Sequence, residues 1–259
     1  MLDKGKLLPV EAASLAGRLG YLGSFFAGQL ASSAVREVRR RAYRAGSFHA
    51  LDEELRSALE WILFHAEIAQ PRDVAVDKRP APVLVFADGA CEPLEDAEPM
   101  VASLGAVIFG DKGTRFFGAQ VPADIAAGWR SGESGQVIGQ AELAPVILAK
   151  KVWQQELRGR DVLFFLDNDA ARYGLVKGYS AVESSMDILR SNARVDIEGD
   201  FRAWYCRVNT SSNPADAASR LDPEMVLANF PEAVHLELPS ELWGLVRSSS
   251  RRRRGEEGR

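Results

Sequence analysis

Four acidic residues occupy positions from which their carboxylates could converge on a single metal site. Two of them end apolar runs that are typical of buried strands, one opens a helical pattern, and one follows an Asn-Pro-Ala sequence. In chain order they are Asp88, Glu142, Asp167 and Asp216. Strand ends and helix starts can meet at one rim of a sheet, and converged carboxylate oxygens suit one or two Mg²⁺ ions. The pattern therefore predicts a metal site of the kind that cleaves phosphodiester bonds.

The segments around these acids predict the elements that must position them. Three apolar runs, the last two joined by a Gly-Asp-Lys-Gly turn, predict an antiparallel meander. The predicted strands are 83–88, 103–109, 114–121, 161–167 and 201–208, and the predicted helices of this part are 138–157, 169–177 and 214–220. A meander followed by alternating strands and helices predicts an α/β fold, with a mixed sheet and flanking helices.

The chain divides into a helical segment, an α/β domain and a tail. Apolar residues recur at three- and four-residue steps near the N-terminus, as at Leu15, Leu19 and Leu22, and predict helices there. A polar stretch with prolines follows and is predicted to be a linker, and the arginine-rich tail is predicted to be disordered. The predicted boundaries are 1–70 for the helical segment, 71–81 for the linker, 82–222 for the α/β domain, 223–247 for a C-terminal extension and 248–259 for the tail.

Composition narrows the class of protein. With 259 residues and 46% hydrophobic composition, the chain can bury a sizeable core. Its formal net charge of −4 argues against a protein whose whole surface is basic and neutralises many nucleic-acid phosphates. Local basic patches are still compatible with this charge. The two cysteines, Cys91 and Cys206, indicate reduced thiols in an intracellular protein, whether nuclear or cytoplasmic. The uncharged stretch 19–35 is too polar for a membrane span and predicts a buried helix.

Two groups of cations allow two interpretations each. Lys150, Lys151, Arg158 and Arg160 could form a patch beside the acids or only a solvated helix face. The four arginines 251–254 could bind nucleic acid or direct the chain to the nucleus, or could belong to a terminus with no specific role.

Three tryptophans and one further acid also have competing interpretations. Trp153 and Trp204 follow apolar patterns and are predicted to lie in the core, whereas Trp129, among glycines, is the candidate for stacking on bases. Asp169, beside Asp167, is expected to be a first-turn helix residue rather than a metal ligand.

Taken together, these motifs resemble the ribonuclease H (RNase H) domain of retrotransposon reverse transcriptases. The resemblance covers residues 82–222 and rests on Asp88-Gly89, Glu142, Asp167-Asn168 and the closing motif Asn213-Pro214-Ala215-Asp216-Ala217-Ala218-Ser219-Arg220. The closing motif is the most specific part and is similar to that of gypsy-type and DIRS-type elements. Residues 1–70 resemble, more weakly, the helical connection segment of such elements.

The resemblance implies an RNase H-like mixed sheet of five strands in the order 3-2-1-4-5, with flanking helices and an N-terminal helical segment. It implies hydrolysis of the RNA strand of RNA–DNA hybrids with two Mg²⁺ or Mn²⁺ ions, and a reverse-transcriptase polymerase domain as a candidate partner. The implied catalytic residues and metal ligands are Asp88, Glu142, Asp167 and Asp216. Residues beside the acids that could contact the hybrid backbone are Gly89, Gln140, Asn168, Ser211 and Asn213.

Departures from the family pattern keep a second function open. No histidine lies between Asp167 and Asp216, where the family often has one before the last aspartate. The alternative is a non-catalytic RNase H-like module, left from a decayed element, that binds nucleic acid or protein. A related 3′–5′ exonuclease would need Asp-x-Glu in its first motif, and Asp88-Gly89-Ala90 offers no second carboxylate. An integrase or transposase would have its Glu last, whereas here the Glu is second, and the chain lacks the adjacent Asp-Asp pair that a polymerase needs.

Overall fold

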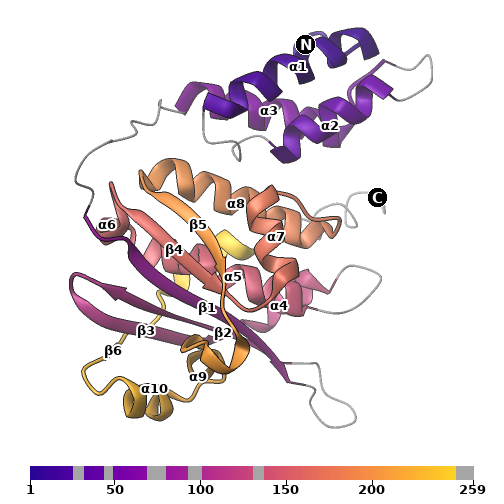
Figure 1. Ribbon diagram of the computed structural model, residues 1–259. Helices are drawn as coiled ribbons and strands as arrows, with labels where there is room; N and C mark the ends of the chain where they lie inside the picture. Colours follow the sequence, from indigo (N-terminus) through magenta and orange to yellow (C-terminus); the bar gives the residue numbers. More distant parts are fainter. Residues whose placement is uncertain (26–31, 44–48, 69–79, 93–100, 131–136, 249–259) are drawn as a thin grey trace. The chain divides into compact units, whose positions relative to one another are not determined.

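The computed structural model describes residues 1–25, 32–43, 49–68, 80–92, 101–130 and 137–248 (Figure 1). The chain forms two compact units, and each is described by itself. The first comprises Met1–Asp77 with Lys177–Tyr179, and the second Lys78–Val176 with Ser180–Arg259. Most of the predicted linker 71–81, and all but the first residue of the predicted tail 248–259, lie outside the described residues.

The first unit is helical where it is described. Its helices are α1 (Pro9–Phe25), α2 (Ser32–Tyr43) and α3 (Glu53–Ile68). Buried apolar side chains from all three, among them Ala12, Val38 and Leu55, form one core. Tyr21 and Leu22 are exposed, so the prediction of a buried helix over 19–35 was wrong for that part of α1. Among the described helices, none has the length and apolar character needed to span a membrane.

The second unit contains a mixed sheet in the order β5-β4-β1-β2-β3-β6. β1, β2 and β3 form an antiparallel meander, and β4, β5 and β6 add parallel to β1, β4 and β3. The strands are β1 (Val83–Glu92), β2 (Val101–Gly110), β3 (Gly113–Gln120), β4 (Asp161–Leu166), β5 (Arg202–Arg207) and β6 (Val234–His235). This confirms the predicted α/β class, a mixed sheet with flanking helices; five of the strands follow the predicted order 3-2-1-4-5, but the predicted total of five strands was wrong because a sixth strand pairs with β3. The structure adds β6, whose two residues are too few to make a sequence pattern.

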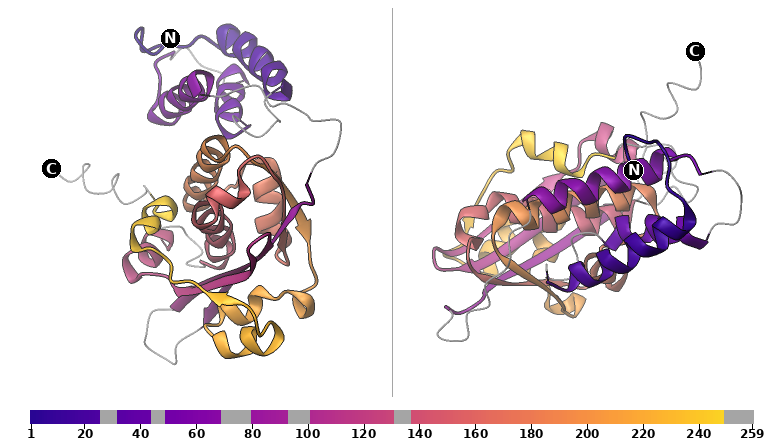
Figure 2. Two further views of the ribbon diagram at one scale, coloured as in Figure 1. Left: turned by 90° about the vertical axis from the view of Figure 1, so that its left-hand side faces the viewer. Right: turned by 90° about the horizontal axis from the view of Figure 1, so that it is seen from above.

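Helices cover both faces of this sheet (Figures 1 and 2). α5 packs on β1 and β2, with α8 packed on α5, and α9 lies on the opposite face over β1, β2 and β3. The helices of this unit are α4 (Ala123–Trp129), α5 (Ile138–Val152), α6 (Gln154–Leu157), α7 (Asp169–Lys177), α8 (Glu183–Gly199), α9 (Ala215–Ser219) and α10 (Pro223–Asn229), with short 3-10 helices η1 (Thr210–Ser212) and η2 (Ser240–Val246).

Helices α4 and α8 were not among the predicted elements. In α8 the helical pattern is masked because four of its buried residues are polar, namely Ser184, Ser185, Asn192 and Asp196. Two of these polar residues hold a buried cation. The Nζ of Lys150 on α5 donates to Asn192 Oδ1 and Asp196 Oδ1 at 2.6 Å each, and to Tyr205 Oη on β5 at 2.7 Å. Lys150 therefore ties α5 to α8 and β5, and because it is fully buried, neither a cationic patch nor a solvated helix face describes it.

The tryptophans only partly follow their predictions. Trp153 lies in the core as predicted. Trp129 is also buried, and its Nε1 donates to the carbonyl of Val246 at 2.8 Å, so it cannot serve as a base-stacking platform. Trp204 is 63% exposed, so its predicted core position was wrong.

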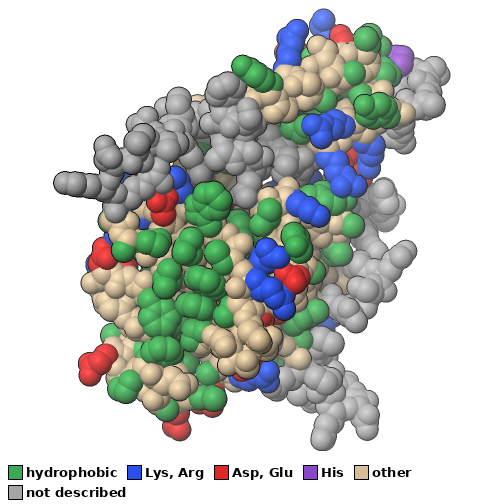
Figure 3. All heavy atoms as spheres, viewed as in Figure 1, with side chains coloured by type: hydrophobic (Ala, Val, Ile, Leu, Met, Phe, Trp, Pro, Cys, Tyr) green, Lys and Arg blue, Asp and Glu red, His purple; other side chains and the backbone are tan. Residues whose placement is uncertain are grey.

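The exposure of Trp204 follows from an uncovered part of the sheet. The paired residues Leu84, Leu163 and Trp204 form one row across β1, β4 and β5. Two residues further along the strands, the rings of the paired Phe86 and Phe165 stack with their centroids 4.6 Å apart. Figure 3 shows hydrophobic side chains gathered on this face. Trp204 lies on the edge strand β5, whereas α9 packs on β1, β2 and β3, so the apolar pattern of β5 did not mark a buried position.

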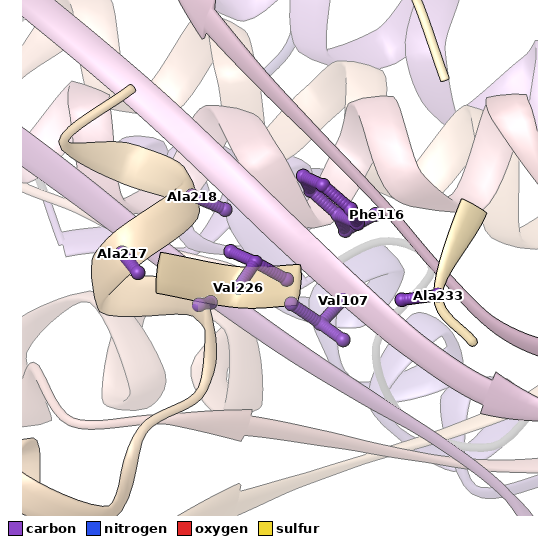
Figure 4. Close-up of a cluster of buried hydrophobic side chains, with 7 residues drawn as sticks. Val107, Phe116, Ala217, Ala218, Val226 and Ala233 are labelled. Carbon is purple, nitrogen blue, oxygen red and sulfur yellow. The ribbon is translucent and has the colours of Figure 1, made fainter. Parts of the chain in front are cut away.

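The part of this face that is covered has a small apolar core. Phe116 and Val107 of the sheet pack with Ala217 and Ala218 of α9 and with Val226 of α10 (Figure 4). Glycines in β2 and β3 allow the backbone of α9 to pack directly against the backbone of the sheet. A Cβ added at Gly105 would lie 2.4 Å from the Ser219 nitrogen, and one added at Gly118 would lie 2.2 Å from the Ala218 carbonyl oxygen.

We expect Gly118→Ala to lower the free energy of unfolding by about 1–3 kcal/mol, because the new methyl group must push α9 away from β3. Chemical denaturation followed by tryptophan fluorescence would measure the change. Gly244→Ala is the matched control, since a Cβ there meets nothing within 4 Å. Equal stability of the two variants would contradict the close seating of α9.

Candidate metal centre

Asp88 lies inside β1 rather than at its end. The strand continues to Glu92, still paired with β2, and Asp88 stands opposite Gly105. The pairing of β1 with β4 ends at Phe86 and Phe165. Two residues further on, Asp88 and Asp167 stand at the same level, where β4 has already ended. The prediction that Asp88 ends its strand was therefore wrong, but the rim at which it meets Asp167 is the end of β4.

Glu142 reaches the same point from α5 because this helix touches β1 with its backbone. A Cβ added at Gly89 would lie 2.3 Å from the carbonyl carbon of Ala141 and 2.6 Å from the nitrogen of Glu142. Glycine is the residue that allows two backbones to approach so closely. Gly89 was predicted to contact substrate, and the structure gives it a buried packing role in β1.

The three carboxylates of Asp88, Glu142 and Asp167 converge. One oxygen of each lies within 4.8 Å of the others. Asp88 and Glu142 are buried, with 5% and 6% of their surface exposed, whereas Asp167 is half-buried. These side chains come from the middle of β1, the first turns of α5 and the residue after β4. Together they form one acidic pocket at the end of β4.

Asp216 lies beside this group without joining it. Both of its carboxylate oxygens accept hydrogen bonds from Nε of Arg220, at 3.1 and 3.0 Å. Its charge still contributes to raising the pKa of Asp88. The structure thus brings together three of the four predicted ligands and places the fourth in an ion pair on α9, next to them.

Two residues of the closing motif hold Asp88. Ser219 donates its hydroxyl hydrogen to Asp88 Oδ2, and Asn213 Nδ2 lies 3.4 Å from Asp88 Oδ1. Asn213 also accepts a hydrogen bond from the nitrogen of Ala215 at 3.2 Å, so it shapes the start of α9. Ser219 belongs to the closing motif, but its contact with Asp88 spans 131 positions of the chain and has no local sequence pattern.

Without a bound cation, the three carboxylates are electrostatically unfavourable neighbours. Burial raises the pKa of Glu142 to about 9, and the charges of Asp88 and Asp167 add to this rise, against hydrogen bonds from Asn168 and the Gly89 backbone. Burial also raises the pKa of Asp88 to about 6, with Asp167 and Asp216 adding to it and the Ser219 hydrogen bond opposing it. Like charges that share a buried site disfavour ionisation of one another.

The donor set fits a divalent metal ion. Glu142 Oε2 is buried and has no hydrogen-bond partner among the described residues, and Oε1 has Asn168 Nδ2 at a distance of 3.5 Å. A buried carboxylate oxygen without a donor is costly unless a cation satisfies it. Hard carboxylate oxygens are the ligands that Mg²⁺ and Mn²⁺ prefer. A cation in this pocket would offset the repulsion between the carboxylates and would supply the partner that Glu142 Oε2 lacks.

The predicted hybrid-contacting residues divide into outward and inward ones. Asn168 is half-buried at the pocket, where its Oδ1 also accepts from the nitrogen of Ala171 at 3.1 Å. Ser211 is exposed on η1. Gln140 is 2% exposed and donates to Ser184 Oγ at 2.8 Å, so its amide is turned into the protein and is not available to a nucleic acid in this structure.

Asp169 is held by arginines rather than by the acidic group. Its carboxylate accepts from Arg172 Nη2 at 2.8 Å and from Arg207 Nη1 at 2.6 Å. Arg207 also donates to the carbonyl of Asp167 at 3.2 Å. Asp169 is the first residue of α7 and lies outside the converging set, as the sequence analysis expected.

Comparisons with known proteins find structural but not sequence matches. No family model matches the chain, and no curated protein matches it. One similar solved structure is RNase H1 from the halophilic archaeon Halobacterium salinarum NRC-1, with 19% identity over 56% of this chain and 99% of that chain and a TM-score of 0.41. Another is LC11-RNase H1 in complex with an RNA/DNA hybrid, with 18% identity over 56% of this chain and 99% of that chain and a TM-score of 0.41. A prototype foamy virus protease-reverse transcriptase is similar at 15% identity over 68% of this chain and 27% of that chain, with a TM-score of 0.35.

The raised pKa values make the metal-free protein sensitive to pH. Because the folded state binds the Glu142 proton more tightly than the unfolded chain does, the free energy of unfolding falls as pH rises from 4.5 toward about 9. Glu142→Gln removes this titration, so in EDTA at pH 8 we expect the variant to be more stable than the parent by on the order of 2 kcal/mol. At pH 5 the difference should shrink.

Urea unfolding at pH 5 and pH 8 would measure both differences. Glu237→Gln is the control, because Glu237 is exposed and outside the pocket. If the parent and Glu142→Gln lost stability equally between the two pH values, the buried and repulsive state of Glu142 would be contradicted.

Proposed function

We propose that this protein is a divalent-metal-dependent endoribonuclease that hydrolyses the RNA strand of RNA–DNA hybrids. The observation that carries the proposal is the convergence of Asp88, Glu142 and Asp167 within 4.8 Å, from β1, α5 and the end of β4. A sheet in the order 3-2-1-4-5 with Asp, Glu and Asp at these places is the arrangement that the sequence resemblance implied for RNase H. The unpartnered Oε2 of Glu142 supports a cation as the missing partner.

The chain's own residues would divide the work of the reaction among them. Asp88, Glu142 and Asp167 would hold the ions, and Asp216 would join them once it separates from Arg220. Bound Mg²⁺ or Mn²⁺, proposed as two ions, would supply an activated water and charge stabilisation for the leaving oxygen, so no side-chain nucleophile is needed. Asn168 would orient Glu142 and offer its amide to the hybrid backbone, and exposed Ser211 could add a contact to a 2′-hydroxyl.

The finer assignment is to the RNase H domain of a gypsy-like or DIRS-like retrotransposon reverse transcriptase, or to a remnant of one. It rests on the closing motif from Asn213 to Arg220 and on the helical unit at the N-terminus, which resembles a connection segment. A polymerase domain is the partner that this assignment proposes. The rival function, a non-catalytic binding module, shares the fold but requires no metal.

Cleavage of a labelled RNA–DNA hybrid with and without Mg²⁺ tests the proposal. We expect metal-dependent scission of the RNA strand by the parent chain, and a loss of at least about 100-fold in rate for Asp167→Asn, because the variant loses a charged ligand. Asp169→Asn should keep most of the activity, since Asp169 lies two residues away but is held by arginines outside the pocket.

Two results would count against the proposal. Hybrid binding without any metal-dependent scission would favour the binding module. Equal loss of activity in Asp167→Asn and Asp169→Asn would show that the rate does not depend on the acidic pocket itself.

A further inference from the structure

Ser219 is a fully buried residue on α9 that no step of the proposed reaction uses. Its exposed fraction is 0%, and its hydroxyl lies within hydrogen-bond reach of two acceptors, Asp88 Oδ2 and the carbonyl of Asp216 at 2.9 Å. A serine hydroxyl has only one hydrogen to donate. A hydrogen bond to a carboxylate is stronger than one to a neutral carbonyl, so the hydrogen goes to Asp88.

The position of Ser219 is set by the sheet rather than by its own short helix. Asp88, Gly105 and Gly118 are paired residues in one row across β1, β2 and β3. α9 lies over this row, and Gly105 and Gly118 bring its backbone against the sheet at Ala218 and Ser219. A side chain at either glycine would lift α9 and carry the Ser219 hydroxyl away from Asp88.

The resulting contact constrains the first carboxylate of the pocket. Asp88 has Ser219 on Oδ2 and the weaker contact of Asn213 on Oδ1, while β1 fixes its backbone through pairing with β2. Residues that hold a metal ligand in this way orient it and tune its affinity for the ion. We propose, on the basis of the proposed function, that Ser219 is a positioning residue that fixes the Asp88 carboxylate for metal binding.

Metal binding in the absence of nucleic acid tests this role directly. The full chain is titrated with Mg²⁺, and the dependence of the melting temperature on the Mg²⁺ concentration gives the dissociation constant, which is the concentration that half-saturates the site. We expect Ser219→Ala to raise that concentration about tenfold. Ser219→Cys keeps the volume but has a weak donor, so it should fall between Ser219→Ala and the parent.

The chain offers a matched control for the loss of a serine-to-aspartate hydrogen bond. Ser248 is also buried, and its Oγ donates to Asp187 Oδ2 at 3.0 Å, but neither residue belongs to the acidic pocket. Ser248→Ala should leave the half-saturating Mg²⁺ concentration unchanged, even if it lowers the melting temperature. This separates positioning of a metal ligand from a general effect on stability.

Kinetics with the hybrid add a second readout. At low Mg²⁺, Ser219→Ala should have a lower kcat with an unchanged KM, and high Mg²⁺ should restore most of kcat, because Ser219 touches Asp88 and not the substrate. A raised KM with a normal Mg²⁺ response would overturn the positioning role. If Ser219→Ala proved unfolded by circular dichroism, the comparison of Ser219→Cys with Ser248→Ala would decide.

The failure of this inference can be told apart from failure of the proposed function. If Ser219→Ala and Ser219→Cys bind Mg²⁺ like the parent while Asp167→Asn does not, the positioning role is wrong and the metal site stands. An equal Mg²⁺ shift in Ser248→Ala would also overturn it. If the folded parent neither responds to Mg²⁺ nor cleaves the hybrid, the proposed function fails and the role of Ser219 fails with it.

Discussion

The second unit is built around a repulsive arrangement, in which three carboxylates share one largely buried pocket. Such a group stays together only if its backbone positions are imposed by stronger contacts nearby. Those contacts are direct approaches of helix backbone to strand. α5 meets β1 at Gly89, and α9 meets β2 and β3 at Gly105 and Gly118. Because β1, β2 and β3 are hydrogen-bonded to one another, the two helices are held in fixed positions on one sheet, and the acids cannot move apart to relieve their repulsion.

The two helices differ in how firmly they are anchored. α5 is fifteen residues long, is covered by α8, and is tied to its surroundings by the buried Lys150, whose three hydrogen bonds reach α8 and β5. α9 has five residues and depends on its close seating on the sheet. Glu142 therefore lies on a well-anchored helix, whereas Asp216 is partly exposed and forms an ion pair with the exposed Arg220. We therefore expect Asp216 to change its position at the pocket more readily than Glu142.

Much of this architecture could be predicted from the sequence, because strong local patterns mark it. The apolar runs before Asp88 and Asp167 and the helical pattern over 138–157 predicted the elements that carry the three converging acids, whereas the strand order came from the family resemblance. What failed depends on partners distant in the chain. β1 continues past Asp88 because β2 pairs with it, Trp204 is exposed on a face of the sheet where α9 packs on β1, β2 and β3, and Gln140 turns inward to hydrogen-bond Ser184. The contact of Ser219 with Asp88 has no local signature at all.

The shortness of α9 has a consequence for how the chain can vary. Asp216 and Ser219 lie three residues apart on one helix, and each residue of an α-helix turns by about 100°, so inserting or deleting one residue between them would rotate one side chain out of place. The same change would shift Ala218 off the glycines beneath it. Length variation is thus excluded from this segment. Active proteins related to this sequence should keep the same number of residues between Asp216 and Ser219, even where the surrounding residues differ.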